Sequence, residues 1–415
     1  MSNKVLIIAH HFPPSAEVSG ALRTLSMARY LAQMGMEPIV LAPHPSAYPT
    51  LNEATLKMIP DGCEVVRAFA FDVRRHFGFR GRYPMWLAQP DRWSSWWLWG
   101  VPKGMRLIKH HKPRAIWSTY PIGTAHLIAA TLHRRTGIPW IADFRDPVRP
   151  PVGQERRLTA RVRARVDRLT VSEASACVFV TQGARELYER RYGQHEHGRF
   201  EVIPNGFDEE AFTDIQTPSA GLRSPGRPLV LVHSGVLYPK GRNPEPFFKA
   251  LSTMFASDAV SRDELRVVLR ASGSEPRYGE LISRYGLDEI VSLAPAVSRD
   301  EALAEQSEAD ALLLFQGSEF NSQVPAKVYE YFRVGRPIFA LVDEAGDTAR
   351  LLRDEGVGAT ADINDPEAIA RRLAEFIEGV KADRYKILEG EGLAKYSRRE
   401  GARQLLQLIQ QVSPR

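Results

Sequence analysis

The sequence has little of several features that would point to particular protein classes. Only two cysteines occur among 415 residues, Cys63 and Cys177, and neither has a partner at metal-ligand spacing. This usage excludes a disulfide-based fold and favours a reducing compartment. No run approaches the roughly 18 apolar residues that a membrane span needs. The opening segment MSNKVLIIAHHF has too short an apolar run for a signal peptide and predicts a first strand. We therefore expect a cytoplasmic protein.

Length and composition favour two soluble domains. The chain is 44% hydrophobic and 25% charged, and 415 residues exceed what one ordinary core accommodates. Short apolar runs alternate with helix-length segments throughout, which predicts parallel sheets with helical crossovers. We expect an N-terminal acceptor-side Rossmann-like domain over residues 1–207, a Pro-, Gly- and Ser-rich linker over 208–228 and a second Rossmann-like domain over 229–385. Residues 386–415 are predicted to form a helical tail, which could pack back on the N-terminal domain.

The first predicted strand, Lys4–Ala9, leads into a loop where ligands bind in parallel sheets, at the carboxyl edge. Ser19 and Gly20 allow the backbone to approach a ligand closely at the start of the next helix. Arg23 can reach a phosphate or a carboxylate. His11 is a candidate for a polar contact, with a structural role as the equal alternative. These four residues predict a phosphate- or acceptor-binding loop.

The segment PWIADFRDP places a charged cluster at the end of a short predicted strand, PWIA. The cluster contains Asp143, Arg145 and Asp146. Charged groups at the end of a buried strand oppose folding and suit chemistry. We therefore predict catalytic roles for these residues. A structural ion-pair network is the alternative, because such networks also occur at perturbed sites.

The second domain opens with a similar strand and turn. LVLVH is followed by Ser234 and Gly235 at the predicted carboxyl end of the strand. Lys240 and Arg242 lie just beyond this turn, where either cation could meet a diphosphate. The choice between these two cations stays open at this point.

The stretch from Ser318 to Asp343 predicts a loop, a helix, a turn and a buried strand. Pro325 suits the first helical turn and Gly335 suits the end of the helix. Lys327 and Glu330 fall three residues apart, so they share a helix face. A helix N-terminus attracts phosphate, Lys327 adds positive charge, and Glu330 can accept hydrogen bonds from sugar hydroxyls. This pattern predicts a nucleoside-diphosphate site, and an ordinary surface ion pair is the alternative.

Aromatic and basic residues gather in two neighbouring segments. Residues 83–99 hold five of the seven tryptophans, and residues 149–168 hold seven arginines. This combination suits contact with an anionic membrane surface. The alternative is a buried aromatic cluster beside a solvated amphipathic helix. Nucleic-acid binding is disfavoured, because no nucleic-acid module accompanies the charge.

Five segments in this order resemble a known family. They are HFPP…SGALRTLSMARYLAQMGMEPIVLAP, PWIADFRDPV, VIPNGFDEEAF, HSGVLYPKGRNPEPFFKAL and VPAKVYEYFRVGRPIFAL. Together they are similar to the landmarks of GT-B glycosyltransferases of the group 1 type, and they span essentially the whole chain. The resemblance implies an α/β fold of two Rossmann-like domains facing each other across a cleft. It also implies a nucleotide-sugar donor and transfer with retention of anomeric configuration.

The resemblance assigns roles residue by residue. It implies that Glu330 binds the ribose hydroxyls, that Arg242 and Lys327 neutralise the diphosphate, and that the Gly20 loop faces the donor phosphates. The cluster from Asp143 to Asp146 would lie nearer the sugar and the acceptor. The resemblance also places Asn321 and Val324 in the donor-binding segment. It implies no metal and no cofactor, with a UDP- or GDP-sugar as co-substrate.

The sequence departs from the family pattern at one position. Many members carry a glutamate eight residues before the position of Glu330, where this chain has Ser322. The role of contacting the donor sugar therefore stays open among Ser322, Glu319 and Asn321. Ser322 is a candidate catalytic residue on this basis.

Three functional hypotheses follow. The first is a retaining, hexosyltransferase-type enzyme of polysaccharide biosynthesis, acting on a polysaccharide, lipid-linked or small-molecule acceptor, and peripheral on the inner face of the cytoplasmic membrane. The second is a nucleotide-sugar 2-epimerase on the same fold, with the cluster from Asp143 to Asp146 as acid and base. The third is a non-catalytic member that binds sugar or nucleotide, which Ser322 favours.

Overall fold

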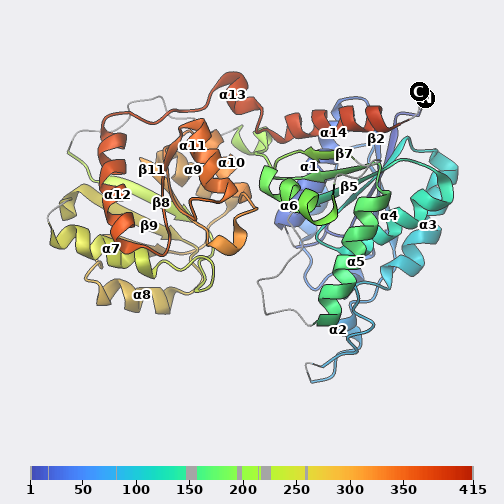
Figure 1. Ribbon diagram of the computed structural model, residues 1–415, viewed down its shortest axis with the longest axis horizontal. Helices are drawn as coiled ribbons and strands as arrows, with labels where there is room; N and C mark the ends of the chain where they lie inside the picture. The colour runs from blue at the N-terminus through green and yellow to red at the C-terminus, as the bar shows by residue number, and fades with distance from the viewer. Residues whose placement is uncertain are drawn as a thin grey trace. The chain divides into compact units, whose positions relative to one another are not determined.

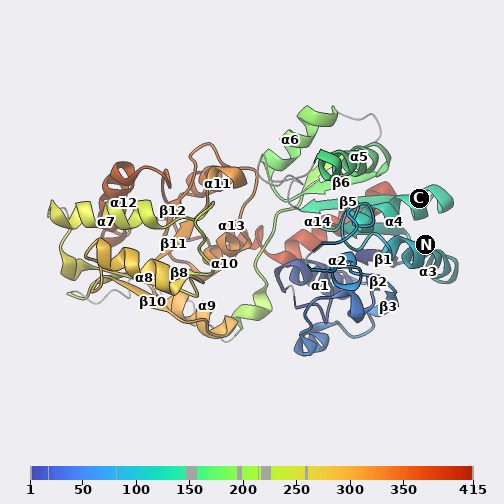
Figure 2. The same cartoon turned by 90° about the horizontal axis from the view of Figure 1, so that it is seen from below.

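The computed structural model describes residues 2–16, 18–80, 82–145, 157–193, 199–213, 215, 226–257 and 260–413. The chain divides into two compact units. The first contains Met1–Asn205 with Arg398–Arg415, and the second contains Gly206–Ser397. Each unit has a parallel sheet with helices on both faces (Figures 1 and 2). The predicted α/β architecture of two Rossmann-like domains is confirmed.

The first unit is built on a seven-stranded parallel sheet. Its strands in spatial order are β3 (Glu64–Ala68), β2 (Glu37–Pro43), β1 (Lys4–Ala9), β4 (Ala115–Thr119), β5 (Trp140–Arg145), β6 (Ala176–Phe179) and β7 (Arg199–Val202). The strand order reverses between β1 and β4. The central strand β1 is buried on both faces, so its sequence is continuously apolar rather than alternating.

Two helical layers cover this sheet. One contains α3 (Trp96–His111), α4 (Gly123–Thr136), α5 (Arg157–Glu173) and α6 (Gln182–Tyr192); the other contains α1 (Val18–Gln33) and α14 (Arg398–Val412). Leu6 and Ile8 pack under the first layer, and Val5 and Ile7 under the second, as the two-residue period of a strand requires. A short helix, α2 (Val73–His76), lies in the segment after β3.

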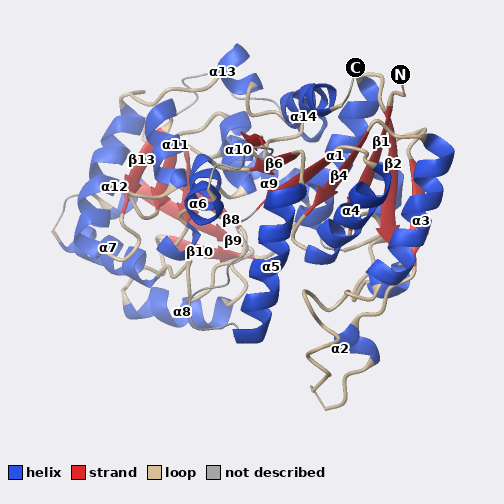
Figure 3. Cartoon of the chain, turned by 45° about the vertical axis from the view of Figure 1, so that its right-hand side comes forward, coloured by secondary structure: helices blue, strands red, loops and turns tan. Residues whose placement is uncertain are grey.

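The second unit is built on a six-stranded parallel sheet. Its strands in spatial order are β10 (Val291–Ala294), β9 (Leu265–Arg270), β8 (Leu229–Ser234), β11 (Ala311–Phe315), β12 (Ile338–Leu341) and β13 (Gly358–Ala361). Here the order reverses between β8 and β11. Figure 3 shows these strands between their covering helices.

The helices of the second unit also form two layers. They are α7 (Glu245–Ala256), α8 (Glu275–Arg284), α9 (Arg299–Glu308), α10 (Ala326–Val334), α11 (Asp347–Glu355), α12 (Pro366–Lys381) and α13 (Gly390–Ala394). One core contains α7, α8 and α12, and the other contains α9, α10 and α11. Helices α7 and α12 lie side by side (Figures 1 and 2).

Two segments differ in position from the sequence-based boundaries. Within the segment predicted as a linker, residues 209–212 form a 3₁₀ turn whose Phe212 is buried in the core of the second unit, and residues 216–225 lie outside the described part of the chain. Within the predicted tail, α13 belongs to the second unit and α14 to the first. Helix α14 packs along α1, and buried Arg398 donates a hydrogen bond to Ser26 Oγ at 3.1 Å.

No helix in the described part of the chain is both long enough and apolar enough to span a bilayer.

Candidate functional site

A pocket opens at the carboxyl edge of the second sheet, where the strand order reverses. It has a volume of about 240 Å³. Ser234 ends β8 and Gly235 follows it, and Arg270 ends β9. Helix α10 supplies Lys327 and Glu330. Ligands of open parallel sheets bind at such reversal points, because two neighbouring connections leave toward opposite faces and open a crevice. The predicted donor residues Ser234, Gly235, Lys327 and Glu330 therefore come together in one pocket.

Helix α10 presents its N-terminus without a side-chain cap. Pro325 is the N-cap residue, with extended backbone, and the helix begins at Ala326. Gly335 ends it in the left-handed conformation at φ 74°. No side chain caps the first turn of this helix. The uncapped N–H groups and the helix dipole favour an anion at this end.

Lys327 lies in the first turn of α10, and its ammonium is held in place by the β8 end. Its Nζ donates a hydrogen bond to the Ser234 carbonyl oxygen at 2.6 Å. The pKa of Lys327 is lowered to about 7, first by burial and then by the positive charge of Arg242, while Glu330 opposes the shift. Two cations that repel each other are stabilised when an anion lies between them. The geometry therefore suits a phosphate group.

The structure distinguishes between Lys240 and Arg242, the two candidate cations after Gly235. Arg242 is close enough to Lys327 to depress its pKa, and its guanidinium lies 5.0 Å from the centre of the Tyr238 ring. The Nε atom of Arg242 is buried and has no hydrogen-bond partner among the described residues. Lys240 is exposed. Arg242 is therefore the better placed of the two to meet a diphosphate.

Glu330 carries an ion-pair partner that the sequence analysis missed. Its Oε1 atom accepts a hydrogen bond from Arg299 at 2.6 Å. Arg299 is the first residue of α9, directly after Ser298, which forms a capping box with Glu301. The Ser-x-x-Glu pattern could have located this helix start after β10, and with it a basic residue at the carboxyl edge. The second carboxylate oxygen of Glu330 forms no hydrogen bond with any described residue, so the side chain can still accept from a ligand hydroxyl.

Gly235 allows Lys327 to approach β8. Its φ of 123° is a conformation that glycine adopts readily, and a Cβ atom here would lie 2.8 Å from Lys327 Nζ. We expect Gly235→Ala to weaken nucleotide binding at least about tenfold, because the ammonium must leave its position. Calorimetric titration with nucleoside diphosphates measures this. Gly273→Ala is the matched control: φ is 85°, but the added methyl would meet only Val236. Equal losses of affinity in the two variants would contradict the assignment.

The loop before α10 holds the remaining predicted donor residues. Asn321 Nδ2 donates a hydrogen bond to Asp343 Oδ2 at 2.8 Å, which ties the loop to the end of β12. Val324 is buried in the core of the second unit. Ser322 is half-buried. The Glu319 carboxylate lies against Gly241 and Gly317, beside the loop that carries Arg242.

In the first unit, Asp143 and Arg23 form a buried ion pair. Arg23 Nε and one terminal nitrogen each lie 3.2 Å from an Asp143 oxygen, and Thr119 Oγ1 donates to Asp143 at 2.9 Å. Arg23 also donates to the carbonyl oxygens of Ile203 at 3.0 Å and Pro204 at 2.9 Å. Asp143 is fully buried. These contacts are those of a structural ion-pair network, which the sequence analysis gave as the alternative to a catalytic role for Asp143.

Strand β5 is longer than predicted and includes Asp143 and Arg145. It extends to Arg145, where the register with β6 shifts and φ is 54°. Arg145 reaches the first turn of α1, where its guanidinium donates to the Gly20 carbonyl oxygen at 3.0 Å. A methyl group at Gly20 would overlap the buried His11 ring, so Gly20, His11 and Arg145 form one cluster. Asp146 and the side chain of Ser19 lie outside the described residues.

No group of three or more His, Cys, Asp and Glu side chains in the described ranges has the arrangement to hold a metal ion.

Comparisons with known proteins agree with this architecture. Residues 20–206 match the glycosyl transferase 4-like domain. Across the whole chain, 98% of this protein superposes on 100% of Anabaena Alr3699/HepE in complex with UDP, at a TM-score of 0.64 and 17% identity. The chain has the two-domain GT-B fold, and its N-terminal half matches a glycosyl transferase 4-like domain.

Two further proteins are similar to this chain, one over its whole length and one over a short segment. The sucrose-phosphate synthase of Thermosynechococcus elongatus has a TM-score of 0.63 and 17% identity, with 99% of this chain and 98% of that chain covered. The probable glycosyltransferase WbjE of Pseudomonas aeruginosa is 31% identical over 68 residues. That match covers 16% of this chain and only 17% of WbjE. The expected GT-B fold is confirmed.

Proposed function

We propose that this protein transfers a sugar, with retention of anomeric configuration, from a nucleoside diphosphate sugar to a glycan, lipid-linked or small-molecule acceptor. The single observation that carries this proposal is the convergence of Lys327, Arg242 and the α10 N-terminus beside Glu330. A nucleoside diphosphate needs positive charge for its phosphates and acceptors for its ribose hydroxyls, and this pocket offers both. The related fold of Alr3699/HepE is described in complex with UDP, which supports a uridine nucleotide among the candidates.

The departing diphosphate explains why these groups would accelerate the reaction. Negative charge on the leaving group grows as the glycosidic bond to phosphate breaks. Lys327 and Arg242 are fixed in position beforehand by Ser234 and by the loop around Tyr238. Preorganised cations stabilise developing charge without reorganising at the moment of reaction. No metal ion or cofactor is part of this proposal.

Glu330 would bind the ribose hydroxyls, with Arg299 orienting its carboxylate. The sugar-contacting residue would come from the loop carrying Glu319, Asn321 and Ser322. Asn321 already donates a hydrogen bond to Asp343, so Glu319 is a better candidate than Asn321. Ser322 remains a candidate because of its position in the sequence. We place the protein in polysaccharide biosynthesis, as a peripheral protein on the inner face of the cytoplasmic membrane.

The 2-epimerase alternative needs an acid and a base that face the sugar. Asp143 accepts from Arg23 and Thr119 and is fully buried, so it is poorly suited to exchange protons with a substrate. Product analysis separates the two activities, because transfer or hydrolysis releases a free nucleoside diphosphate whereas simple 2-epimerisation does not. Nuclear magnetic resonance of the glycoside product tests retention directly.

A thermal-shift and calorimetric panel of nucleotides tests the donor site. A ligand at a hundredfold excess over its Kd stabilises the folded state by about 2.7 kcal/mol. We expect selective stabilisation by one nucleotide, UDP or GDP, and loss of that stabilisation in Glu330→Ala, because the ribose contact is removed.

The matched control for this panel is Glu344→Ala. Glu344 also pairs with an arginine, Arg353, at 2.7 Å, but both side chains are about half exposed and lie away from the pocket. The control should keep the native nucleotide response. No response to any nucleotide in the native protein would exclude the proposed donor site.

A further inference from the structure

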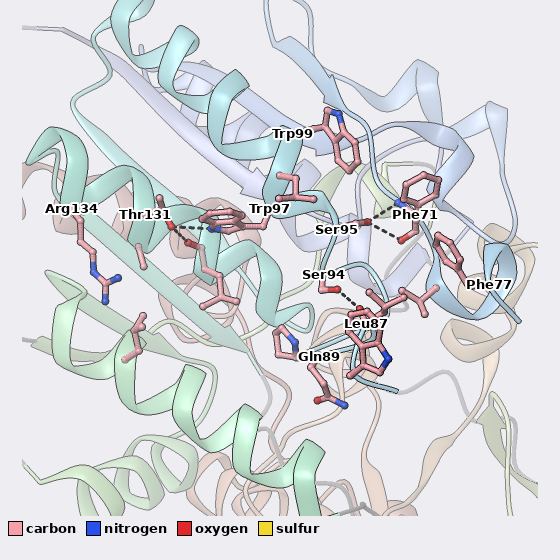
Figure 4. A pocket seen from close by; sticks show the side chains of 17 residues that line it. Phe71, Phe77, Leu87, Gln89, Ser94, Ser95, Trp97, Trp99, Thr131 and Arg134 are labelled. Atoms are coloured by element: carbon pink, nitrogen blue, oxygen red, sulfur yellow. Dashed lines mark hydrogen bonds between the residues drawn. The ribbon is translucent and has the colours of Figure 1, made fainter. Parts of the chain in front are cut away.

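The first unit contains a large apolar cavity that the proposed nucleotide chemistry does not use. Its volume is about 660 Å³, within the range of small-molecule sites. The walls come from the segment after β3, from the start of α3, from α4 and from α5; they include Phe71, Phe77, Trp97, Trp99, Leu127 and Leu169. Figure 4 shows the rings of Phe71, Phe77, Trp97 and Trp99 around it.

The polar groups in the cavity wall are already bonded to the protein. Trp97 Nε1 donates to Thr131 Oγ1 at 3.0 Å, and that hydroxyl donates to the Leu127 carbonyl oxygen at 2.8 Å. Ser94 donates to the Leu87 carbonyl oxygen. Because these donors already bond to the protein, the cavity wall offers an occupant apolar contacts rather than hydrogen bonds.

Charge in the wall is neutralised as well. Arg134, which lies at the opposite end from Phe77 in Figure 4, forms a bidentate pair with Glu173. Among the described lining residues, Gln89 Oε1 is the one buried side-chain oxygen without a donor. The cavity therefore suits an occupant that is almost wholly hydrocarbon.

The surface around the cavity is apolar where surfaces are normally polar. Three lining side chains are also widely exposed: Trp86 at 73%, Leu98 at 57% and Phe77 at 47%. Phe79 follows Phe77 by two residues and is 74% exposed. A contiguous exposed apolar surface around a cavity marks an interaction site.

Helix α5 adds positive charge beside this surface. It lines the cavity through Leu169 and is joined to the Trp86 segment by the hydrogen bond from Gln89 to Thr159 at 3.0 Å. Its other face exposes Arg161, Arg165 and Arg168, which form no ion pair with a carboxylate in the described ranges. Unpaired arginines beside exposed aromatic rings complement an anionic lipid leaflet, because rings enter the interface and cations meet the headgroups.

We propose that this cavity binds the hydrocarbon chain of a membrane lipid that serves as the sugar acceptor. The exposed rings would seat the first unit on an anionic leaflet, the α5 arginines would attract its headgroups, and one lipid chain would enter the cavity against Trp97 and Trp99. This inference rests on the proposed glycosyltransferase function and narrows its acceptor to an amphiphile. Binding becomes more favourable with each CH₂ group that leaves water for the cavity.

Brominated lipid tests the location of the chain, because bromine quenches indole fluorescence only at short range. The full chain, carrying Trp86→Phe to remove the exposed indole, is mixed with vesicles of phosphatidylcholine and phosphatidylglycerol whose acyl chains are dibrominated. We expect vesicle binding by sedimentation and strong quenching relative to unbrominated vesicles. Ala130→Phe, which fills the cavity from α4, should keep sedimentation and reduce the quenching at least about threefold.

A second variant and its control guard against misfolding. Leu98→Asp places a charge at the exposed rim and should reduce the quenching, whereas Leu56→Asp, at a leucine 43% exposed outside the cavity, should not. Absence of vesicle binding, binding without quenching, or quenching that persists in Ala130→Phe would each overturn the proposal. The nucleotide panel on the same preparations distinguishes failure of the lipid proposal from failure of the proposed function. If the lipid effects are lost but nucleotides still stabilise the protein, only the assignment of the cavity is rejected.

Discussion

Replacing Lys327 by methionine is expected to lower kcat/KM for the nucleotide sugar by about 10²–10³-fold, the usual effect of deleting one preorganised group that stabilises developing negative charge. The Ser234 carbonyl holds the ammonium at 2.6 Å, so few other side chains can take its place. Release of free nucleoside diphosphate under single-turnover conditions measures the loss. A decrease of less than about threefold would show that Lys327 does not act on the leaving group.

The same lysine predicts how nucleotide affinity changes with pH. The pKa of Lys327 is about 7 against an ordinary 10.5, chiefly because of burial. A bound diphosphate favours the charged form, so binding requires proton uptake at any pH above 7. Affinity should therefore fall as pH rises above 7, by up to about tenfold for each pH unit. Lys327→Arg keeps a charge at every accessible pH and should bind with little dependence between pH 7 and 9.

Stability without ligand should respond in the opposite direction. Between pH 7 and 10.5 the unfolded chain holds a proton on Lys327 that the folded chain releases, so folding becomes more favourable as pH rises through this window. Below pH 7 both states are protonated, and the full cost of burying the charge is present. Lys327→Met removes that cost, so its gain in stability over the native protein should be largest below pH 7. Thermal unfolding at pH 6 and pH 9 measures this difference.

Breaking the Arg23–Asp143 pair is expected to cost about 3–5 kcal/mol of stability, because either single replacement leaves an uncompensated buried charge. Arg23→Met strands the Asp143 carboxylate, and Asp143→Leu strands the guanidinium together with its carbonyl contacts. The double variant should cost less than the sum of the two singles, since both charges are then removed. Chemical denaturation of the four proteins gives the coupling energy.

The control for this double-mutant cycle is the exposed pair of Arg372 and Glu375, whose side-chain nitrogen and oxygen are 2.9 Å apart. Its coupling should not exceed about 1 kcal/mol, because water screens both charges. A coupling energy for Arg23 and Asp143 no larger than that of the exposed pair would contradict a structural ion pair. It would favour the catalytic role of Asp143 instead. The measurement thus decides between the two alternatives that the sequence left open.

Much of the fold could be predicted from the sequence because its signals are local. The apolar runs of β1 and β11 are continuous since both faces of their sheets are covered. Gly335 ends α10 where the sequence indicated, because a left-handed residue is needed there. The face shared by Lys327 and Glu330 follows from helix geometry alone, and both residues line one pocket.

Other parts of the site depend on residues far apart in the chain. Arg299 meets Glu330 across 31 positions, and Arg23 meets Asp143 across 120. A charged residue after an apolar run looks the same in sequence whether it faces a ligand or a buried partner. Only the tertiary structure shows that Asp143 is enclosed by Arg23 and Thr119.

The sequence by itself determined the two βα series, the edge of each sheet where polar residues gather, and the helix face that Lys327 and Glu330 share in α10, because strand and helix periods and turn residues act over a few positions. The tertiary structure alone decided that Arg242 rather than Lys240 lies close to Lys327, and that the tryptophan-rich segment encloses a cavity. Side chains separated by a turn or by a whole domain are brought together by packing, and packing is not encoded in any short stretch of residues.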